Sequence, residues 1–372
     1  MKKTKRKFVI VFRFICAIIL TFYYPVTLSF ALPEGESVQS GNFSFNQQGN
    51  VLNINQATGK GIINWNSFSI ASPEAVNFFQ SGAAAIALNR VVGANPSDIF
   101  GALTANGQIW LINPNGILFG RDSRVDVSGL LASTSGISNE NFLNGRYIFD
   151  SPGSGSIINN GILNAANGGY IALLSNTIDN NGIITASLGK VVLAGGEKFT
   201  VDLYGNNLLS VVVDEGTTQN IADKADQILN TGTITADGGT VLITARQVTG
   251  IFDNAVNQAG LIRANSLIEH DGVIELITDN GIIINTGTID VSAAEAGVDG
   301  GYIYKEGNRV GQFGEVHADA IDGDGGKIEI WASDVVAIGS DSLTLPTRAL
   351  MVMAVKLLCF HQKRLYLDRM LK

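Results

Sequence analysis

Three aspartates near the C-terminal end form the densest cluster of candidate metal ligands in this sequence. Asp319, Asp322 and Asp324 lie in HADAIDGDGGKIEI, which starts at His317. Carboxylates at this spacing can bind calcium. The segment lacks the bidentate glutamate that follows the central glycine of an EF-hand loop, and it lacks the repeated nonapeptide of calcium-binding β-rolls. We therefore expect a solvated corner rather than a calcium site.

Histidines and paired acids offer no stronger candidate for chemistry. His270 and His317 are far apart in sequence, and neither belongs to a His-x-x-x-His or Cys/His cluster. Polysaccharide-active β-helices need paired acids, or calcium with a basic residue, on one face. Asp and Glu are scattered here, with few Lys or Arg beside them. We expect no catalytic residue, no metal, no cofactor and no enzymatic activity.

The charge distribution excludes nucleic acid as a partner. Residues 1–31 hold six Lys or Arg, and residues 346–372 hold six Lys or Arg and one Asp. The body between them therefore carries 13 basic and 32 acidic residues, a net charge of −19. An acidic body without a basic stripe cannot neutralise phosphates. Such a body is typical of an extracellular surface.

One candidate recognition element remains, the tetrad Asn113-Pro114-Asn115-Gly116. It interrupts two apolar runs in LINPNGILFG, residues 111–120. Proline presets the second position of a β-turn, and Asn or Gly accepts a positive φ. The tetrad therefore predicts a tight turn between two strands.

The elements around the tetrad follow a repeat. Similar stretches begin at Ile157, Ile178, Ile228 and Ile283, and each has an Asn or Thr, a Gly and then alternating apolar residues. Their glycines, at 161, 182, 232 and 287, are 21, 50 and 55 residues apart. A period near twenty with short strands and Asn/Gly corners predicts a β-solenoid, whose stacked coils bury inward Ile, Val and Leu. A β-sandwich is the alternative. We expect the glycines to fill corners that need a positive φ, and we expect an N-terminal cap. We expect Trp65, Trp110 and Trp331 to be core residues or residues that stack between coils.

The first 31 residues read as a secretory signal peptide. Six cations precede an apolar run, and Ser29-Phe30-Ala31 fits a cleavage site. An uncleaved membrane anchor is the alternative. Cys16 lies in this segment and Cys359 near the C-terminus, with no cysteine between them. An exported protein without disulfides can cross a membrane in an extended state.

The segment from 37 to 140 and the coils after it resemble two-partner secretion exoproteins, the filamentous haemagglutinin family with its N-terminal secretion domain. The matching motifs, in order, are INWNSFSI (63–70), LNRV (88–91), SDIFGAL (97–103), GQIWLINPNGILFG (107–120), DVSGLLAST (126–134), SNENFLNGRYIF (138–149) and GGYIALLS (168–175). The resemblance spans roughly residues 36–340.

The resemblance implies an all-β chain folded as a right-handed parallel β-helix with an N-terminal cap. Residues 32–150 would form the secretion domain, and residues 151–344 would continue the coils. The chain would reach the periplasm, be recognised by the periplasmic domains of an outer-membrane transporter, and fold outside the cell. The transporter would recognise the tetrad Asn113, Pro114, Asn115 and Gly116, or the tetrad would nucleate folding of the β-helix. The alternative is that they only make a well-defined corner.

The last segment, 345–372, departs from this pattern. It has no Gly or Asn, is basic and holds most of the methionines. Codons that encode Leu350 to Lys356 also encode Ala-Asn-Gly-Asp-Gly-Gly-Lys when read one nucleotide earlier. That string resembles DGDGGK at 322–327. We therefore expect an aberrant tail produced by a frameshift near 342–348; a C-terminal amphipathic helix is the alternative.

The sequence predicts a truncated exoprotein, secreted or held at the cell surface after passing through the periplasm. Its expected partners are the outer-membrane transporter and a host-cell or surface receptor. The longer parent would be an adhesin or haemagglutinin. A secreted cytolysin or contact-dependent toxin is the alternative, and a β-helical polysaccharide-active enzyme is the weaker one.

Overall fold

The structure is a computed structural model that describes residues 32–203, 209–220, 223–339 and 350–355. Chain contacts separate Met1–Phe30 from Ala31–Lys372, and the fold below belongs to the second unit. The predicted signal peptide, both cysteines and most of the predicted tail lie outside the described residues. Within the described ranges, no helix has both the length and the apolar character needed to cross a membrane.

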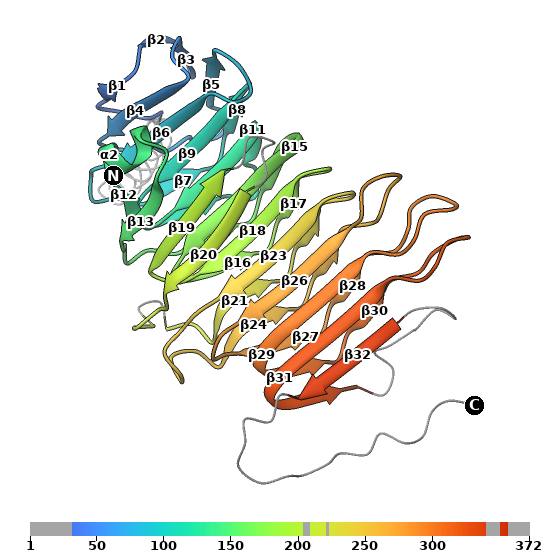
Figure 1. The fold of residues 1–372 in the computed structure, drawn as a ribbon. Helices are drawn as coiled ribbons and strands as arrows, with labels where there is room; N and C mark the ends of the chain where they lie inside the picture. The colour runs from blue at the N-terminus through green and yellow to red at the C-terminus, as the bar shows by residue number, and fades with distance from the viewer. Residues whose placement is uncertain (1–31, 204–208, 221–222, 340–349, 356–372) are drawn as a thin grey trace, which may run out of the picture. The chain divides into compact units, whose positions relative to one another are not determined.

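The strands stack coil upon coil in three ladders that are parallel throughout, except at the first strand of two of them (Figure 1). The first ladder contains β7 (Ser97–Ile99), β10 (Ile117–Phe119), β14 (Ile157–Asn159), β16 (Ile178–Asn180), β21 (Asp226–Asn230), β24 (Asn254–Gln258), β27 (Ile282–Asn285) and the C-terminal parts of β29 (Tyr302–Gln312) and β31 (Lys327–Ile338). The second contains β2 (Phe43–Gln48), β3 (Val51–Gln56), β5 (Ala75–Gln80), β8 (Ala102–Ala105), the N-terminal parts of β11 (Arg124–Ser133) and β15 (Ile162–Ser175), β17 (Ile183–Thr185), β22 (Thr233–Thr235), β25 (Leu261–Arg263), β28 (Thr288–Asp290) and β30 (Glu315–His317).

The third ladder contains β1 (Ser37–Ser40), β4 (Lys60–Trp65), β6 (Ile86–Val91), β9 (Gln108–Ile112), the C-terminal parts of β11 and β15, β18 (Lys190–Gly195), β23 (Thr240–Ala245), β26 (Val273–Thr278), the N-terminal parts of β29 and β31, and β32 (Leu350–Val355). Strands β11, β15, β29 and β31 run round a corner and join the ladders into one 28-stranded sheet. This is the predicted parallel β-helix, which is confirmed.

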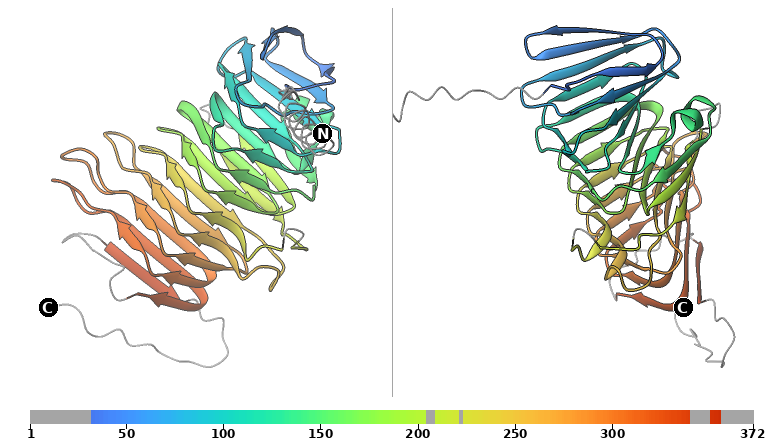
Figure 2. Two further views of the ribbon diagram at one scale, coloured as in Figure 1. Left: turned by 180° about the vertical axis from the view of Figure 1, so that it is seen from behind. Right: turned by 90° about the vertical axis from the view of Figure 1, so that its left-hand side faces the viewer.

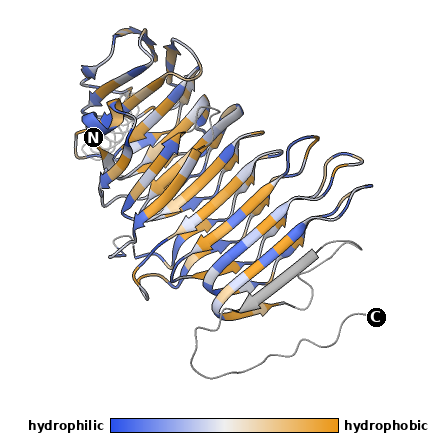
Figure 3. Cartoon of the chain, in the orientation of Figure 1, coloured by the Kyte–Doolittle hydropathy of each residue, from blue (hydrophilic) through white to orange (hydrophobic). Residues whose placement is uncertain are grey.

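Alternation along each strand places the core inside the coils. One inward column runs through six coils in register, from Ile157 through Ile178, Ile228, Val256 and Ile283 to Val310, and every member is buried. Burying one such aliphatic side chain contributes about 1.5–3 kcal/mol. Figure 3 shows hydrophobic residues on the strands of successive coils, interspersed with hydrophilic ones. The predicted ladder of inward aliphatic residues therefore holds the coils together.

The corner glycines are needed for a reason other than the predicted one. None of Gly161, Gly182, Gly232 and Gly287 has a positive φ. A Cβ on Gly182 would lie 2.2 Å from the carbonyl oxygen of Gly161, and one on Gly232 would lie 2.1 Å from that of Gly182. The expectation of a positive φ at these corners was wrong, because close stacking of successive carbonyls excludes the side chain.

A ladder of side-chain amides runs inside the same corner. Asn159 donates to Asn180 (2.8 Å), Asn180 donates to Asn230 (2.7 Å), and Asn230 donates to Gln258 (2.6 Å). All four residues are buried. Each amide both donates and accepts, so the ladder satisfies polar groups that the apolar interior would otherwise leave unpaired.

The N-terminal end carries the predicted cap. Strand β1 pairs antiparallel with β4, and β2 forms an antiparallel hairpin with β3. These strands are the blue elements at the start of the stack in Figures 1 and 2. The cap interrupts the parallel pattern where the first coil would otherwise offer an edge.

A second, smaller sheet covers the outer face of the third ladder. It contains β12 (Gly136–Ile137), β13 (Tyr147–Ser151), β19 (Lys198–Leu203) and β20 (Leu209–Glu215), all antiparallel, with helix α2 (Asn139–Leu143) beside it. Its apolar residues pack against outward residues of β4, β6, β9, β11, β15 and β18 and form a second core. The repeat pattern of the sequence does not predict this cover sheet.

The three tryptophans have different positions. Trp65 lies in the central core, as predicted. Trp110 is buried, but it lies outside the coils, between β9 and the cover sheet. Trp331 is only half-buried and sits on the outward face of β31, so of the two predicted positions it does not occupy the core. Alternation along a strand does not reveal which of its two faces points inward when both carry apolar residues.

Candidate functional site

The tetrad Asn113 to Gly116 connects β9 of the third ladder to β10 of the first. Asn113 and Gly116 are buried, Pro114 is half-buried, and Asn115 is exposed. The Gly116 amide donates to the Asn113 carbonyl at 3.1 Å, which closes a β-turn, and Gly116 has a φ of +115°. The predicted tight turn is therefore present, and at this corner the glycine does adopt a positive φ.

The Asn113 side chain organises the turn from within. Its Oδ1 accepts from the backbone amide of Asn115 at 3.0 Å and from Asn115 Nδ2 at 3.2 Å. An asparagine that accepts from the amide two residues later forms an Asx-turn. These bonds lie inside the tetrad and close the turn locally.

The tetrad is also bonded to the coil before it. Asn113 Nδ2 donates to the carbonyl of Asn95 and to Ser97 Oγ, both at 3.0 Å. Asn115 Nδ2 donates to the carbonyl of Gly93 at 2.9 Å. The turn therefore ties β10 to the segment that leads into β7.

Contacts with the following coil complete the enclosure. The Gly155 amide donates to the Pro114 carbonyl at 2.9 Å. A Cβ on Gly153 would lie 2.5 Å from that same carbonyl oxygen, and a Cβ on Gly155 would lie 2.2 Å from the Gly116 nitrogen. Asn115 and part of Pro114 are what the tetrad presents to solvent.

The motif LNRV, noted in the sequence only for its resemblance, has a specific structural role. Asn89 is buried and its Oδ1 accepts from Trp65 Nε1 at 3.0 Å. Arg90 donates to Asn64 Oδ1 (3.2 Å), Asn139 Oδ1 (2.8 Å) and the Ile137 carbonyl (2.6 Å). Burial lowers the pKa of Arg90. Arg90 thus joins the β-helix to β12 and α2, a role that the sequence alone did not indicate.

Aromatic side chains fill the space between β9 and the cover sheet. The Trp110 ring lies 4.8 Å from Tyr147 and 5.5 Å from Phe142, measured between ring centroids. Trp110 Nε1 donates to the Tyr170 hydroxyl at 2.8 Å, and that hydroxyl donates to Gln108 Oε1 at 2.7 Å. Burial raises the pKa of Tyr170. This chain of bonds satisfies the polar atoms of an otherwise apolar layer.

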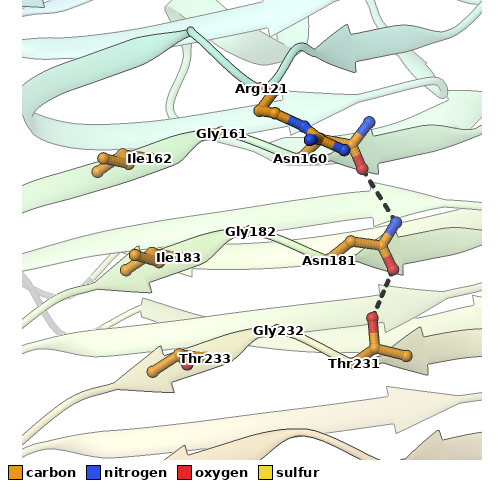
Figure 4. Close-up of a pocket in the computed structure, with 10 residues that line it drawn as sticks. All are labelled: Arg121, Asn160, Gly161, Ile162, Asn181, Gly182, Ile183, Thr231, Gly232 and Thr233. Carbon is orange, nitrogen blue, oxygen red and sulfur yellow. Dashed lines mark hydrogen bonds between the residues drawn. The ribbon is translucent and has the colours of Figure 1, made fainter.

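A groove runs along the outer side of the glycine corner (Figure 4). Its volume is about 580 Å³, and Arg121 is the charged residue at its rim. Asn181 donates to Asn160 at 3.0 Å and accepts from Thr231 at 2.6 Å, so polar side chains form one wall across three coils. These exposed bonds run parallel to the buried amide ladder on the inner side of the same corner.

The aspartates and histidines discussed above are spread over the C-terminal coils. Asp322 and Asp324 are exposed. His317 Nε2 lies 3.4 Å from Glu315 Oε2, and its Nδ1 lies 3.8 Å from Asp319 Oδ2. Among the residues that the structure describes, no three His, Cys, Asp or Glu side chains lie close enough to share a metal ion. The expectation that the protein needs no metal or cofactor stays a prediction.

Residues 29–291 match the family described as the TPS secretion domain, and the chain therefore belongs to this family of two-partner secretion exoproteins. Membership implies secretion across the outer membrane with the help of a cognate transporter.

Two heme/hemopexin-binding proteins of Haemophilus influenzae are similar in sequence. One is 36% identical over 233 residues, which cover 59% of this chain and 25% of the relative. The other is 29% identical over 273 residues, which cover 67% of this chain and 28% of the relative. The chain thus spans about a quarter of the length of these relatives, which are named for binding and not for catalysis.

Solved structures of secretion domains have a similar fold. The HMW1 secretion domain from Haemophilus influenzae matches with a TM-score of 0.62 and 23% identity, over 86% of this chain and 98% of that one. The filamentous hemagglutinin secretion domain matches with a TM-score of 0.49 and 18% identity, over 83% and 99% of the two chains. At 23% identity the likeness to the HMW1 secretion domain concerns the fold alone.

Proposed function

We propose that the tetrad is part of the surface that the transporter's periplasmic domains read, with Asn115 and Pro114 as the contact residues and Asn113 and Gly116 as their supports. The observation that carries this proposal is the division of the tetrad into buried and exposed members. The Asx-turn is closed by bonds within four residues. A partly folded chain can therefore present this turn before its coils have stacked.

Asn115→Ala tests this proposal. The cognate transporter and the full chain are expressed together, and the protein in the medium is measured. We expect at least a fivefold loss of export, while the purified variant keeps the circular dichroism of a β-helix. Asn181→Ala is the matched control, because Asn181 is also a corner asparagine with two side-chain bonds, and its export should stay normal. Normal export of Asn115→Ala, or loss of its fold, would contradict a recognition role.

We infer that the longer exoprotein acts by binding at the cell surface. The notion of an adhesin or haemagglutinin rests on the secretion-domain family, and the names of the two relatives favour heme or hemopexin as the bound species. The full-length secreted protein should be tested for retention on immobilised hemin and hemopexin, for agglutination of red cells, and for cell lysis. Retention or agglutination supports a binding protein. Lysis without either would instead support the cytolysin alternative.

A further inference from the structure

One lysine lies inside the β-helix. On β29, Ile303, Lys305 and Gly307 face the interior, whereas Tyr304 and Glu306 face outward. The Lys305 side chain has no exposed surface. A buried ammonium loses its hydration and needs several acceptors in return.

The surroundings of Lys305 supply little compensation. Its Nζ donates to Gln312 Oε1, and the same oxygen accepts from Asn285 Nδ2 at 3.1 Å. Leu276 on β26 and Ile330 on β31 are its neighbours in the ladder. Inward residues from every element packed around it are uncharged and do not titrate: Ile274, Leu276 and Thr278 of β26, Ile283 and Asn285 of β27, Ile289 of β28, Val316 of β30, and Ile328, Ile330 and Ala332 of β31.

Two acceptors in this layer are also unsatisfied. Asn285 Oδ1 and Thr278 Oγ1 are buried and have no hydrogen-bond partner among the described residues. The layer therefore holds an ammonium with a single acceptor and two buried acceptor atoms without a donor, and both are unfavourable. No comparable lysine is buried elsewhere in the described interior, where the long polar side chains form amide ladders.

The charge state of Lys305 links this layer to pH. Burial lowers the pKa of Lys305 from 10.5 to about 7. When the coil opens, the amine meets water and its pKa returns toward 10.5. The open state then binds more protons than the closed state between these two values, so opening becomes easier as pH falls from about 10 to about 7 and levels off below.

We propose that the layer around Lys305, where β29 stacks on β26 of the preceding coil, is a pH-dependent opening point, at which the coils C-terminal to β28 separate from the rest of the β-helix. The opening is driven by hydration of the Lys305 ammonium. The N-terminal coils, which hold the tetrad and the cover sheet, stay closed. This opening point divides the β-helix into N-terminal coils that stay folded together and C-terminal coils that can separate from them.

Hydrogen exchange of the full chain, measured by mass spectrometry at pH 7 and pH 9 and corrected for intrinsic rates, tests this proposal. Between these pH values, protection of peptides from β29 and β31 should rise by about thirtyfold to a hundredfold. Peptides from β9 and β10, which contain no titratable side chain, should not change. Lys305→Met should raise protection of β29 at pH 7 and abolish its pH dependence, and Lys305→Gln serves if the methionine variant does not fold.

Lys190→Met is the matched control. Lys190 lies on the outward side of the third ladder, and its pKa is also lowered by burial, with Glu275 acting in the opposite direction. This variant should leave the pH dependence of β29 intact. Equal protection of β29 at both pH values in the unaltered chain, or pH dependence that survives in Lys305→Met, would overturn the proposal.

Discussion

Asn180 occupies the centre of the buried amide ladder, and its removal should be costly. Asn180→Ala deletes the bonds to Asn159 and Asn230 and leaves one donor and one acceptor unpaired on side chains that are at most 1% exposed. Each stranded buried group costs about 1–3 kcal/mol. Two such groups together should lower the free energy of unfolding by about 2–6 kcal/mol.

The adjacent residue provides the comparison. Asn181 also makes two side-chain bonds, to Asn160 and Thr231, but on the solvent side of the same corner. Water replaces both bonds in Asn181→Ala, so its cost should be below about 1 kcal/mol. Urea unfolding of both variants, followed by tryptophan fluorescence and analysed with a shared m-value, measures the difference. Equal costs for the two variants, or a loss below 1 kcal/mol for Asn180→Ala, would refute this account of the ladder.

Two further predictions concern the cover sheet and the tail. Arg90→Met keeps the apolar stem but removes the hydrogen bonds to Asn64, Asn139 and Ile137. Limited proteolysis should therefore cut faster within residues 138–146, while the β-sheet circular dichroism stays the same. Unchanged cleavage would show that Arg90 does not hold this segment. Sequencing the gene beyond codon 342 should show solenoid coding in the alternate frame, and the absence of such coding would end the frameshift hypothesis.

The repeat made the coils predictable because every coil buries its inward aliphatic side chains in the same way. Ile157, Ile178 and Ile228 recur at one point of the pattern and share one inward column. The gap between Gly182 and Gly232 contains one coil enlarged by β19 and β20, whereas the gap between Gly232 and Gly287 contains two coils. Spacing alone cannot separate these cases, because an insertion and an extra coil add similar lengths.

The cover sheet was not predictable for a related reason. Phe199 alternates with polar neighbours as in a coil strand, whereas Phe142 and Phe149 each have an apolar neighbour. Phe142 and Phe149 pack against Trp110, which lies on a strand distant in sequence, and all three phenylalanines belong to the same core cluster as Trp110. In the tetrad, the turn follows from local chemistry, but the bond from Asn113 to Asn95 spans 18 residues and depends on the register of two coils. The tail keeps its frameshift interpretation as a prediction, although Leu350–Val355 pairs in parallel with β31.

The antiparallel cap makes the two ends of the β-helix different from each other. Because β1 and β2 reverse the strand polarity at one end, new coils find a matching template only at the other end. A polypeptide leaving a narrow channel would then fold from this fixed end outward, and each completed coil would oppose the return of the chain into the channel. The folding of successive coils can thereby draw the rest of the chain through the channel.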